Sequence, residues 1–418
     1  MMVLEILLAG VLVAWIALGL RSVWGLAGAS ILRPGLPSEL PFPAHKVSIL
    51  VAARNEEETL PAALESLLAL DYPDYEVILV DDDSTDHTGT IADDWAQRAA
   101  AAGRLKVIHN HELPSGWRGK VHGLSLAAGA ATGEWLLATD ADVVFHPHLL
   151  RLAMSCALRE QARLVSLLPE LELESVAERI VLPAFSFLLA TLFPLRLINS
   201  PKSTRALAAG AFILMRREDY EALGGYARLR DVLAEDLRMA GTFKKSGRRI
   251  YVALTRGLFR TRMYKGWGEI WEGLARSAFE GTGFSLRRIV KGIALGNLLA
   301  VLPWAATVVL LVRDLATGLA FAADLPLQLA LAACLISAAV YMPVLIFLKV
   351  SPLYAATLPI ACVFYSAVAM ASTWMSLRGR GISWKGRYYR PPAPAQSIRV
   401  PGDADPGRSR RDDSTGSA

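Results

Sequence analysis

Residues 136–147 read LLATDADVVFHP, a short apolar run that ends in Asp140 and Asp142 and is followed by Pro147. The run has the length and composition of a buried β-strand. An aspartate after a strand is often the N-cap of the next helix, but Pro147 is expected to start that helix, so the pair lies too early to cap it. Carboxylate oxygens at this spacing suit Mg²⁺ or Mn²⁺ that also binds phosphate oxygens. We therefore predict that Asp142, helped by Asp140, holds a divalent cation.

This strand belongs to a repeating pattern between residues 45 and 265. Short apolar runs alternate there with amphipathic helical segments, and the runs are VSILVAA, YEVILVD, LKVIH and WLLATDAD. The alternation predicts an α/β domain with a mostly parallel sheet and helices on both faces. In such sheets, ligands bind beyond the carboxyl ends of the strands.

Polar and acidic residues gather at those strand ends. The first strand ends near Asn55 and Glu56, and the second ends at Asp81 and Asp82. Clustered carboxylates repel one another unless a positive charge lies among them. We therefore expect a ligand or cation at this edge. For Ser84, Thr85 and Asp86 alone, helix capping remains an equal alternative.

Apolar segments flank the predicted domain. Residues 6–20 carry no charge and are followed by Arg21 and Arg33. We expect a retained membrane anchor within residues 1–30, because no basic segment precedes the apolar run and no small-residue cleavage site follows it. The positive-inside rule then predicts a protein of the cell membrane whose N-terminus lies outside and whose following domain lies in the cytoplasm.

Three further apolar stretches lie near 293–312, 326–348 and 353–376, within residues 289–377. Three crossings would put the following segment outside the cell, yet that segment, SLRGRGISWKGRYYR, is basic and favours the cytoplasm. Two or three spans both remain open. Residues 378–418 are basic at first and then have the composition of a disordered tail.

Composition excludes several classes of protein. The formal net charge is only +5 in 418 residues, which argues against a nucleic-acid partner. The three cysteines form no CxxC pair, which argues against disulfides and a zinc site. His109 and His111 alternate without a third ligand and are expected at the surface. The oligomeric state cannot be read from the chain.

Five segments carry a family resemblance: VAARNEEETL, VDDDSTDHT, GWRGKVHGLSLAAGAATGEWLLATDADVVFHP, GAFILMRREDYEALGGY and AED. Their order and spacing resemble the family 2 glycosyltransferases with the GT-A fold. With the flanking apolar segments and the ending WKGRYYR, the chain is similar to the membrane-bound, lipid-directed branch. Within that branch it is most similar to the glycosyltransferases associated with hopanoid biosynthesis, and more distantly to carotenoid and ceramide glycosyltransferases.

The resemblance implies an inverting hexosyltransferase with Mg²⁺ or Mn²⁺ as cofactor. Its donor would be a nucleotide diphosphate sugar, expected to be a UDP-sugar, and its acceptor the hydroxyl of a hopanoid, isoprenoid or sphingoid lipid. Asp236 matches the position of the catalytic base. The residues expected to bind the nucleotide and its phosphates are Ala53, Asn55, Glu56, Asp81, Asp82, Lys120 and Asp140.

One departure from the family pattern concerns the segment after the base. Many membrane relatives carry Gln or Arg, two residues, and then Arg-Trp, whereas this chain has FRTRMYKGWGEIWEG. Arg262 and Trp267 are candidates for contacts to the diphosphate or the acceptor. The departure argues against a processive polysaccharide synthase, which stays an alternative together with a catalytically silent scaffold in a lipid-synthesis complex.

Residues 176–203 form an apolar stretch inside the domain, interrupted by Pro183 and Pro194. A full crossing there would divide the catalytic domain. We expect an interfacial helix near 176–200 that lies in the headgroup plane, next to an amphipathic juxtamembrane segment over residues 265–288. A lipid acceptor would then enter the site from the membrane.

Overall fold

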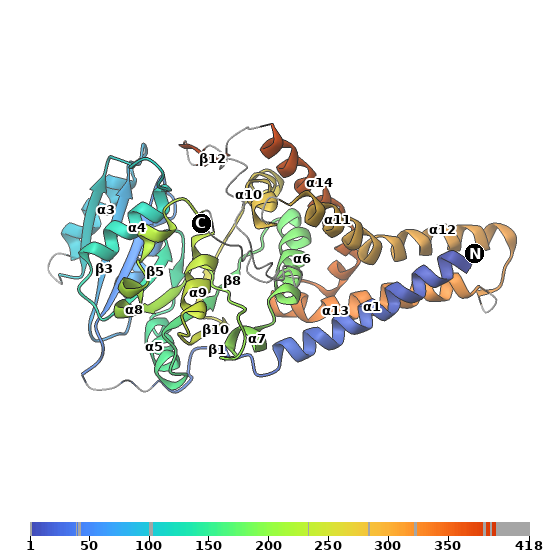
Figure 1. Ribbon diagram of the computed structural model, residues 1–418, viewed down its shortest axis with the longest axis horizontal. Coiled ribbons are helices and arrows are strands. Elements are labelled where there is room, and N and C mark those ends of the chain that lie inside the picture. Colours follow the sequence, from blue (N-terminus) through green and yellow to red (C-terminus); the bar gives the residue numbers. More distant parts are fainter. Residues whose placement is uncertain are drawn as a thin grey trace, which may run out of the picture.

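The computed structural model describes residues 2–38, 40, 43–99, 103–232, 234–282, 285–321 and 324–378, and the backbone of the paired strands β12 (Ile382–Trp384) and β13 (Arg387–Tyr389). The predicted disordered tail lies outside the described residues from 391 onward. Two parts are evident in Figure 1: a sheet covered by helices, and a group of long helices that extends away from it.

The main sheet has eight strands in the order β1-β10-β7-β9-β5-β2-β3-β4. Only β9 runs antiparallel to its neighbours β5 and β7, so the predicted mostly parallel sheet is confirmed. The edge strand β1 lies before residue 45, the predicted start of the domain. The strands are β1 (Ile31–Leu32), β2 (Val47–Ala53), β3 (Tyr75–Asp82), β4 (Leu105–Asn110), β5 (Trp135–Asp140), β7 (Leu164–Leu168), β9 (Ile213–Arg216) and β10 (Ile250–Thr255).

Alternate side chains of the strands fill two separate cores. Ile49 and Val51 of β2 pack in one core, and Leu50 between them packs in the other. This alternation is the period of a β-strand, whose successive side chains point to opposite faces. Both faces are therefore covered by helices, as predicted. The covering helices are α2 (Leu60–Leu68), α3 (Thr88–Ala99), α4 (Gly119–Ala130), α5 (Leu149–Arg159), α8 (Arg217–Ala222) and α9 (Glu235–Lys245).

The helix after the DAD segment begins later than expected. His148 is the N-cap of α5, and Leu149 is its first residue, so Pro147 precedes the helix and does not start it. A second, three-stranded sheet lies beside this point. It contains β6 (Val144–Phe145), β11 (Phe259–Thr261) and β8 (Glu170–Leu171), in the order β6-β11-β8.

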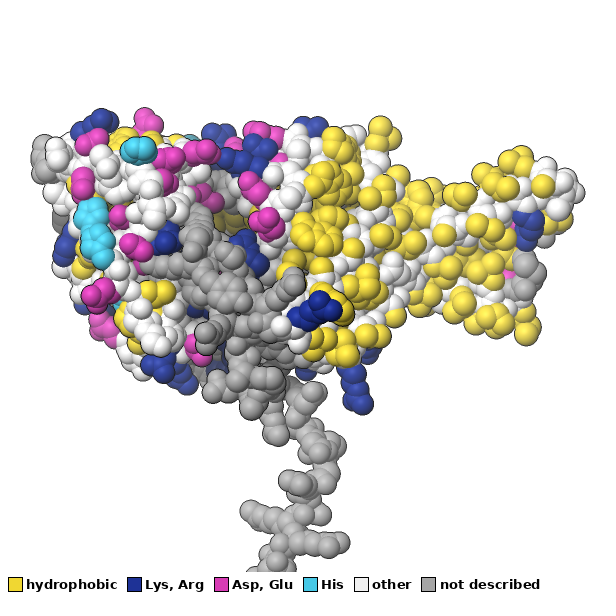
Figure 2. All heavy atoms as spheres, turned by 90° about the horizontal axis from the view of Figure 1, so that it is seen from above, with side chains coloured by type: hydrophobic (Ala, Val, Ile, Leu, Met, Phe, Trp, Pro, Cys, Tyr) yellow, Lys and Arg dark blue, Asp and Glu magenta, His cyan; other side chains and the backbone are white. Residues whose placement is uncertain are grey.

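The long helices form the second part of the molecule. Hydrophobic side chains cover this part, whereas charged side chains gather over the sheet domain (Figure 2). Among the described residues, three helical segments are long and apolar enough to cross a membrane: α1 (Met2–Leu26), α13 (Leu325–Phe347), and the 3₁₀ turn η4 (Pro352–Thr357) together with α14 (Leu358–Leu377).

The predicted span at 293–312 is not one straight helix. It divides into α11 (Leu286–Ala300) and α12 (Leu302–Thr317), which meet at an angle of 41°. Pro303 lies in the first turn of α12 and has no backbone N–H to continue the hydrogen bonding of α11. The pair together still has the length and apolar character of a span.

The predicted interfacial segment is helical. It forms α6 (Val176–Leu192) and the short α7 (Leu195–Asn199), which are separated at Phe193 and Pro194. Figure 1 shows α6 running across the base of the long helices, between them and the sheet. Helix α10 (Gly266–Gly281), within the predicted juxtamembrane segment, packs against α6 and α14.

A fully buried carboxylate joins α6 to the segment that leads into α10. Glu178 Oε1 accepts hydrogen bonds from Ser175 Oγ at 2.7 Å, Arg262 Nη2 at 3.1 Å and the Gly266 N–H at 3.1 Å. Burial alone would raise the pKa of Glu178, but these hydrogen bonds and one from the Glu174 N–H lower it to about 2. Glu178 therefore fastens α6 to the segment that leads into α10.

Replacing Glu178 with Gln is expected to destabilise the protein by roughly 3 kcal/mol, because Arg262 would lose its buried counter-ion. Since the pKa of Glu178 is depressed when folded, its stabilisation is present above about pH 4.5 and is lost as the pH falls toward 2. The measurement is the thermal denaturation midpoint of the full chain in detergent. Glu174, the exposed second partner of Arg262, provides the control. An equal effect of Glu174→Gln would contradict the role of the buried carboxylate.

Candidate active site

The acidic residues predicted at the strand ends lie at one edge of the sheet. Ala53 at the end of β2 pairs with Asp81 of β3, and Ala52 pairs with Asp140 of β5. Asp82 pairs with Asn110 at the end of β4. Because these strands are parallel, their carboxyl ends meet, and the sheet register alone brings the predicted residues together.

The ends of β2 and β3 are fastened to each other by side chains. Asn55 has a left-handed backbone conformation (φ 53°), and its N–H donates to Ser84 Oγ at 3.0 Å. Its Oδ1 accepts from the Thr85 N–H at 2.8 Å. Asp86 Oδ1 accepts from the Thr88 N–H at 3.0 Å, at the start of α3. Asp86 Oδ2 also accepts from the Glu57 N–H at 3.2 Å, so Asp86 joins the start of α3 to the loop after β2, which Ser84 and Thr85 hold as well.

Asp81 and Asp82 are buried behind this loop. Asp82 Oδ1 accepts from Asn110 Nδ2 at 2.8 Å. Asp81 Oδ2 lies 3.2 Å from Nδ1 of His109, whose Nε2 lies 3.0 Å from Asp93 Oδ1. The hydrogen bond to Asp93 raises the pKa of His109, with Asp81 adding to it. His109 is exposed, as predicted, and it also bridges two carboxylates.

Lys120, in the first turn of α4, joins the end of β5 to the start of α9. Its Nζ lies 2.7 Å from Asp140 Oδ1 and 2.8 Å from Oε1 of the buried Glu235. Burial alone would lower the pKa of Lys120, but the two carboxylates raise it well above its usual value. Glu235 was not predicted as a site residue, although it precedes Asp236 in the AED segment.

Asp236 lies in the first turn of α9 and faces the same point. Its Oδ2 accepts from the Gly210 N–H at 3.1 Å, and its Oδ1 accepts from the Leu237 N–H at 2.7 Å. A Cβ atom at Gly210 would lie 3.0 Å from Lys120 Nζ, 3.7 Å from Asp236 Oδ2 and 3.8 Å from Asp140 Oδ2. A Cβ atom there would require the flexible end of Lys120 to shift slightly, and the three charged groups converge on this glycine.

The environment of Asp236 makes its carboxylate more basic. Burial, followed by the negative charge of Glu235, raises the pKa of Asp236 to about 6. The positive charge of Lys120 opposes this shift. A carboxylate with a raised pKa beside a polar cluster has the properties of a general base.

Asp142 lies two residues beyond Asp140 and is partly exposed at the same edge. In the part of the chain that the structure describes, no group of three or more His, Cys, Asp or Glu side chains is arranged to hold a metal ion. Mg²⁺ is commonly held by one or two carboxylates together with substrate phosphates and water. Asp140 and Asp142 therefore fit a cation whose coordination is completed by a diphosphate.

Residues 48–224 match the family described as Glycosyl transferase family 2. The chain contains a family 2 glycosyltransferase domain. The match includes the strand ends, Lys120, the DAD segment and Gly210, whereas Asp236 lies beyond it.

Curated relatives match the chain over part of their length. The beta-monoglucosyldiacylglycerol synthase of a Nostoc species is 36% identical over 143 residues, which are 31% of this chain and 29% of the synthase. The 4,4'-diaponeurosporenoate glycosyltransferase of Staphylococcus haemolyticus is 26% identical over 223 residues, which are 52% of this chain and 57% of that enzyme. The similarity to these enzymes is therefore limited to part of each chain.

A solved structure supports the fold. The mannosyltransferase of Pyrobaculum calidifontis, determined in complex with GDP-Man and Mn²⁺, superposes with a TM-score of 0.52 at 21% identity. The superposition covers 89% of this chain and 99% of the mannosyltransferase. It shows that the family 2 domain here has the GT-A fold.

Arg262 and Trp267 lie where the family 2 domain meets the long helices. Arg262 pairs with Glu174 and the buried Glu178. Trp267 packs against Phe364 of α14, with ring centroids 5.3 Å apart. Their suggested contacts to diphosphate or acceptor stay predictions, and Arg262 would have to leave two carboxylates to reach a phosphate.

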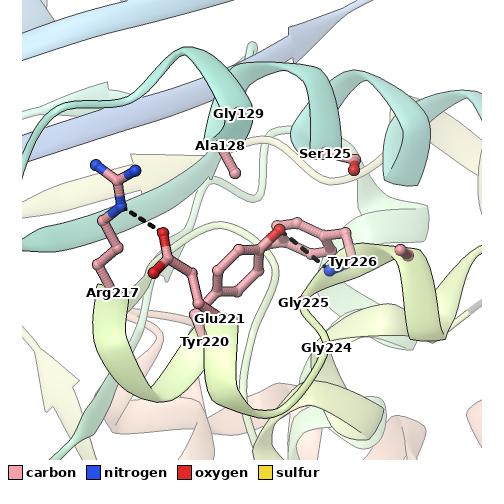
Figure 3. Close-up of a pocket in the computed structure, with 10 residues that line it drawn as sticks. Ser125, Ala128, Gly129, Arg217, Tyr220, Glu221, Gly224, Gly225 and Tyr226 are labelled. Carbon is pink, nitrogen blue, oxygen red and sulfur yellow. Dashed lines mark hydrogen bonds and ion pairs between the residues drawn. The ribbon is translucent and has the colours of Figure 1, made fainter.

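A separate depression of about 370 Å³ lies between α4 and α8 (Figure 3). An ion pair between Arg217 and Glu221 borders it, and the Tyr226 N–H donates to Tyr220 Oη inside it. None of the strand-end acids of the family 2 domain lines this depression, so it is a different place from the candidate active site. Its lining residues are Ser125, Ala128, Gly129, Arg217, Tyr220, Glu221, Gly224, Gly225, Tyr226 and Ala227.

Proposed function

We propose that the protein transfers a sugar from a nucleotide diphosphate sugar, in the first instance a UDP-sugar, to the hydroxyl of a membrane lipid, with inversion at the anomeric carbon. The observation that carries the proposal is the convergence of Asp140, Lys120 and Asp236 on the backbone of Gly210. A metal-binding carboxylate, a phosphate-binding cation and a base are thereby within a few ångströms of one another.

The nucleoside would lie over the ends of β2 and β3. Asp81 and Asp82 are buried acceptors there, and carboxylates of this kind bind ribose hydroxyls or a base N–H. The loop of Asn55 and Glu56 forms the adjacent wall, since its backbone is held by Ser84 and Thr88. This arrangement supports a nucleotide site with little need for rearrangement on binding.

The diphosphate would lie beside Asp140, Asp142 and Lys120. A divalent cation bound there would neutralise the charge that develops on the departing diphosphate. Lys120 supplies a second positive charge, and its flexible side chain can turn from Asp140 to a phosphate oxygen. The ion pair with Glu235 would hold the ammonium group of Lys120 near the diphosphate while the side chain turns.

Asp236 would act as the base. It accepts the proton of the acceptor hydroxyl while the hydroxyl oxygen forms a bond to the anomeric carbon. The bond from that carbon to the diphosphate oxygen breaks in the same step, so one displacement inverts the configuration. The Gly210 N–H and the Leu237 N–H each donate to one carboxylate oxygen, and together they fix the orientation of the carboxylate.

The dependence of kcat/KM on pH follows from this assignment. Because Asp236 must be ionised and its pKa is raised to about 6, kcat/KM is expected to fall as the pH decreases through that value. The Glu235→Gln variant should move the inflection to lower pH, since it removes a negative charge that raises the pKa. The measurement is a pH profile of nucleoside diphosphate release. A profile with no inflection between pH 5 and 7 would contradict the base assignment.

A lipid acceptor is supported by the apolar helices attached to the catalytic domain. It is also supported by the two relatives named above, whose names specify a monoglucosyldiacylglycerol and 4,4'-diaponeurosporenoate. Hopanoid, isoprenoid and sphingoid alcohols remain the proposed acceptor classes. The domain would act at the cytoplasmic face of the cell membrane.

The full chain in lipid nanodiscs, with Mn²⁺ and a panel of UDP- and GDP-sugars, provides the test. We expect release of nucleoside diphosphate that depends on added lipid, and a lipid product that carries one sugar. A ladder of longer products would indicate a polysaccharide synthase instead. Failure of every nucleotide sugar to bind or to raise the thermal stability would indicate the silent scaffold.

A further inference from the structure

We propose that the chain crosses the bilayer three times, through α1, α11–α12 and α13, and that α14 does not cross. Instead, α14 lies with α6 and α10 in the headgroup layer on the side of the family 2 domain. The three helices form a surface that docks on the bilayer. The inference concerns membrane topology and stands apart from the proposed glycosyl transfer.

The helices α1 and α13 run side by side in the same direction. Leu8, near the start of α1, packs in one cluster with Leu327 near the start of α13. Further along, a Cβ atom at Gly19 would lie 2.8 Å from Val340. Both helices therefore begin at the end far from the sheet and finish next to it (Figure 1). With 23 residues, α13 is about 35 Å long, which suffices for a hydrocarbon core of about 30 Å.

The far end of this bundle carries a charged cluster. Arg313 near the end of α12 pairs with Asp314 at 2.6 Å and also with Asp324, which precedes α13. Charges at the bilayer centre are costly. The cluster therefore marks the polar boundary opposite the family 2 domain, and the α12–α13 hairpin reaches it.

Both ends of α14 are fastened on the domain side. Lys349, just before η4 and α14, pairs at 3.0 Å with Glu170 of β8. Near the other end, Ser372 Oγ accepts from the Phe279 N–H of α10 at 3.1 Å. Between them, Tyr365 Oη donates to the Val181 carbonyl of α6 at 2.8 Å. A crossing helix would have one end beside the Arg313 cluster, whereas Figure 1 shows α14 running across the direction of α13.

Exposed tryptophans place this surface at the boundary between membrane and water. Within the part of the chain whose burial is described, the exposed tryptophans are Trp24, Trp267, Trp271 and Trp374. They lie on the last turns of α1, on α10 and on the last turns of α14, which are all at the base of the bundle. Tryptophan is enriched at the boundary between membrane and water. Arginine side chains lie over Trp24 and Trp374, as expected for aromatic rings at headgroup level.

The outer face of the surface is apolar and bordered by basic residues. On α14 the exposed side chains include Ile360, Val363, Met370 and Leu377, which recur at helical spacing along one face. Arg21 at the end of α1 donates to the Thr191 carbonyl of α6, so the anchor and the interfacial helix are joined. This face is continuous with the spanning helices, and the bilayer is the occupant that fits it.

This topology resolves the conflict between the three apolar C-terminal stretches, which suggested three crossings, and the basic segment after them, which favours the cytoplasm. The apolar stretch 353–376 satisfies the hydropathy criterion for a span without crossing, and the basic segment after it stays on the side of the family 2 domain. The positive-inside rule is then obeyed by that segment and by the basic start of α11. A lipid substrate would be taken from the leaflet on that side.

Cysteine accessibility tests the topology in the full chain. Cys156, Cys334 and Cys362 are first replaced by Ala, and single cysteines are introduced by Leu319→Cys, Leu353→Cys or Arg378→Cys. In intact cells, a membrane-impermeant maleimide should label only the Leu319 position, at the hairpin tip. The other two should react only after permeabilisation, like the control Asp94→Cys in the family 2 domain. Labelling of Leu353 and Arg378 from opposite sides would overturn the proposal.

The depth of α14 provides a second readout. A fluorophore at Val363→Cys in the middle of α14 should be quenched by lipids labelled near the headgroup. A fluorophore at Leu335→Cys in α13 should be quenched by lipids labelled deep in the acyl chain. Equal, deep quenching of both would show that α14 crosses. Neither result depends on catalytic activity, so failure of the glycosyl transfer proposal would leave this one standing.

Discussion

The Asp236→Asn variant is expected to lose about 10³-fold in kcat, with little change in the KM for the donor. The amide keeps the size of the side chain and can still accept from the Gly210 N–H, but it cannot take the acceptor proton. Because the pKa of Asp236 is raised to about 6, the wild-type carboxylate is both ionised and basic near neutral pH. The loss should therefore fall on the chemical step.

Single-turnover measurements of nucleoside diphosphate release are the check, together with donor binding by calorimetry. Asp231→Asn changes an exposed carboxylate shortly before the same helix and serves as the matched control. It should retain wild-type kcat. An Asp236→Asn protein as active as the wild type would remove Asp236 from the mechanism.

The second large effect is expected for Asp142→Asn. Loss of charge neutralisation at the leaving diphosphate removes several kcal/mol of transition-state stabilisation, which corresponds to roughly 10³-fold or more in rate. The Mn²⁺ concentration needed for half-maximal activity should rise as well, since an amide is a weaker ligand than a carboxylate. If a chelator abolishes the activity of the wild type and Mn²⁺ restores it, the requirement for a divalent cation is supported.

A Mn²⁺ titration of the variant at saturating donor separates metal binding from folding. Asp94→Asn on α3 changes an exposed carboxylate of the same domain away from the strand ends and should leave the titration unchanged. An unaltered metal dependence in the Asp142 variant would show that the cation is held elsewhere or is not required.

Much of the fold could be predicted because its central strands β2, β3 and β5 are almost entirely buried. Continuous apolar runs such as VSILVAA have few alternatives to a central parallel strand, and parallel strands place their carboxyl ends together. Asp81 and Asp140 could therefore be expected near Ala53 before any contact was known. The family resemblance added Asp236, which no local pattern distinguishes from a residue at a helix start.

The contacts that complete the site could not be predicted in the same way. Lys120 meets Glu235 across more than one hundred residues, and Gly210 meets Asp236 through a backbone hydrogen bond. Nothing in the local pattern of either segment encodes such pairings. Hydropathy also failed to distinguish the orientations of α13 and α14, because it measures apolar length and contains no information on what fastens a helix at its ends. The pair of Lys349 with Glu170 supplies that information.

The central claim is that the carboxylates at the sheet edge hold a cation that is shared with a nucleotide diphosphate. Anomalous scattering from crystals of the full chain grown with Mn²⁺ and UDP tests it most directly. The account predicts one manganese peak at about 2 Å from a carboxylate oxygen of Asp142 and also bonded to the diphosphate, with Asp236 facing the same cavity. A bound nucleotide whose phosphates lie away from Asp140 and Asp142, with no manganese between them, would contradict it.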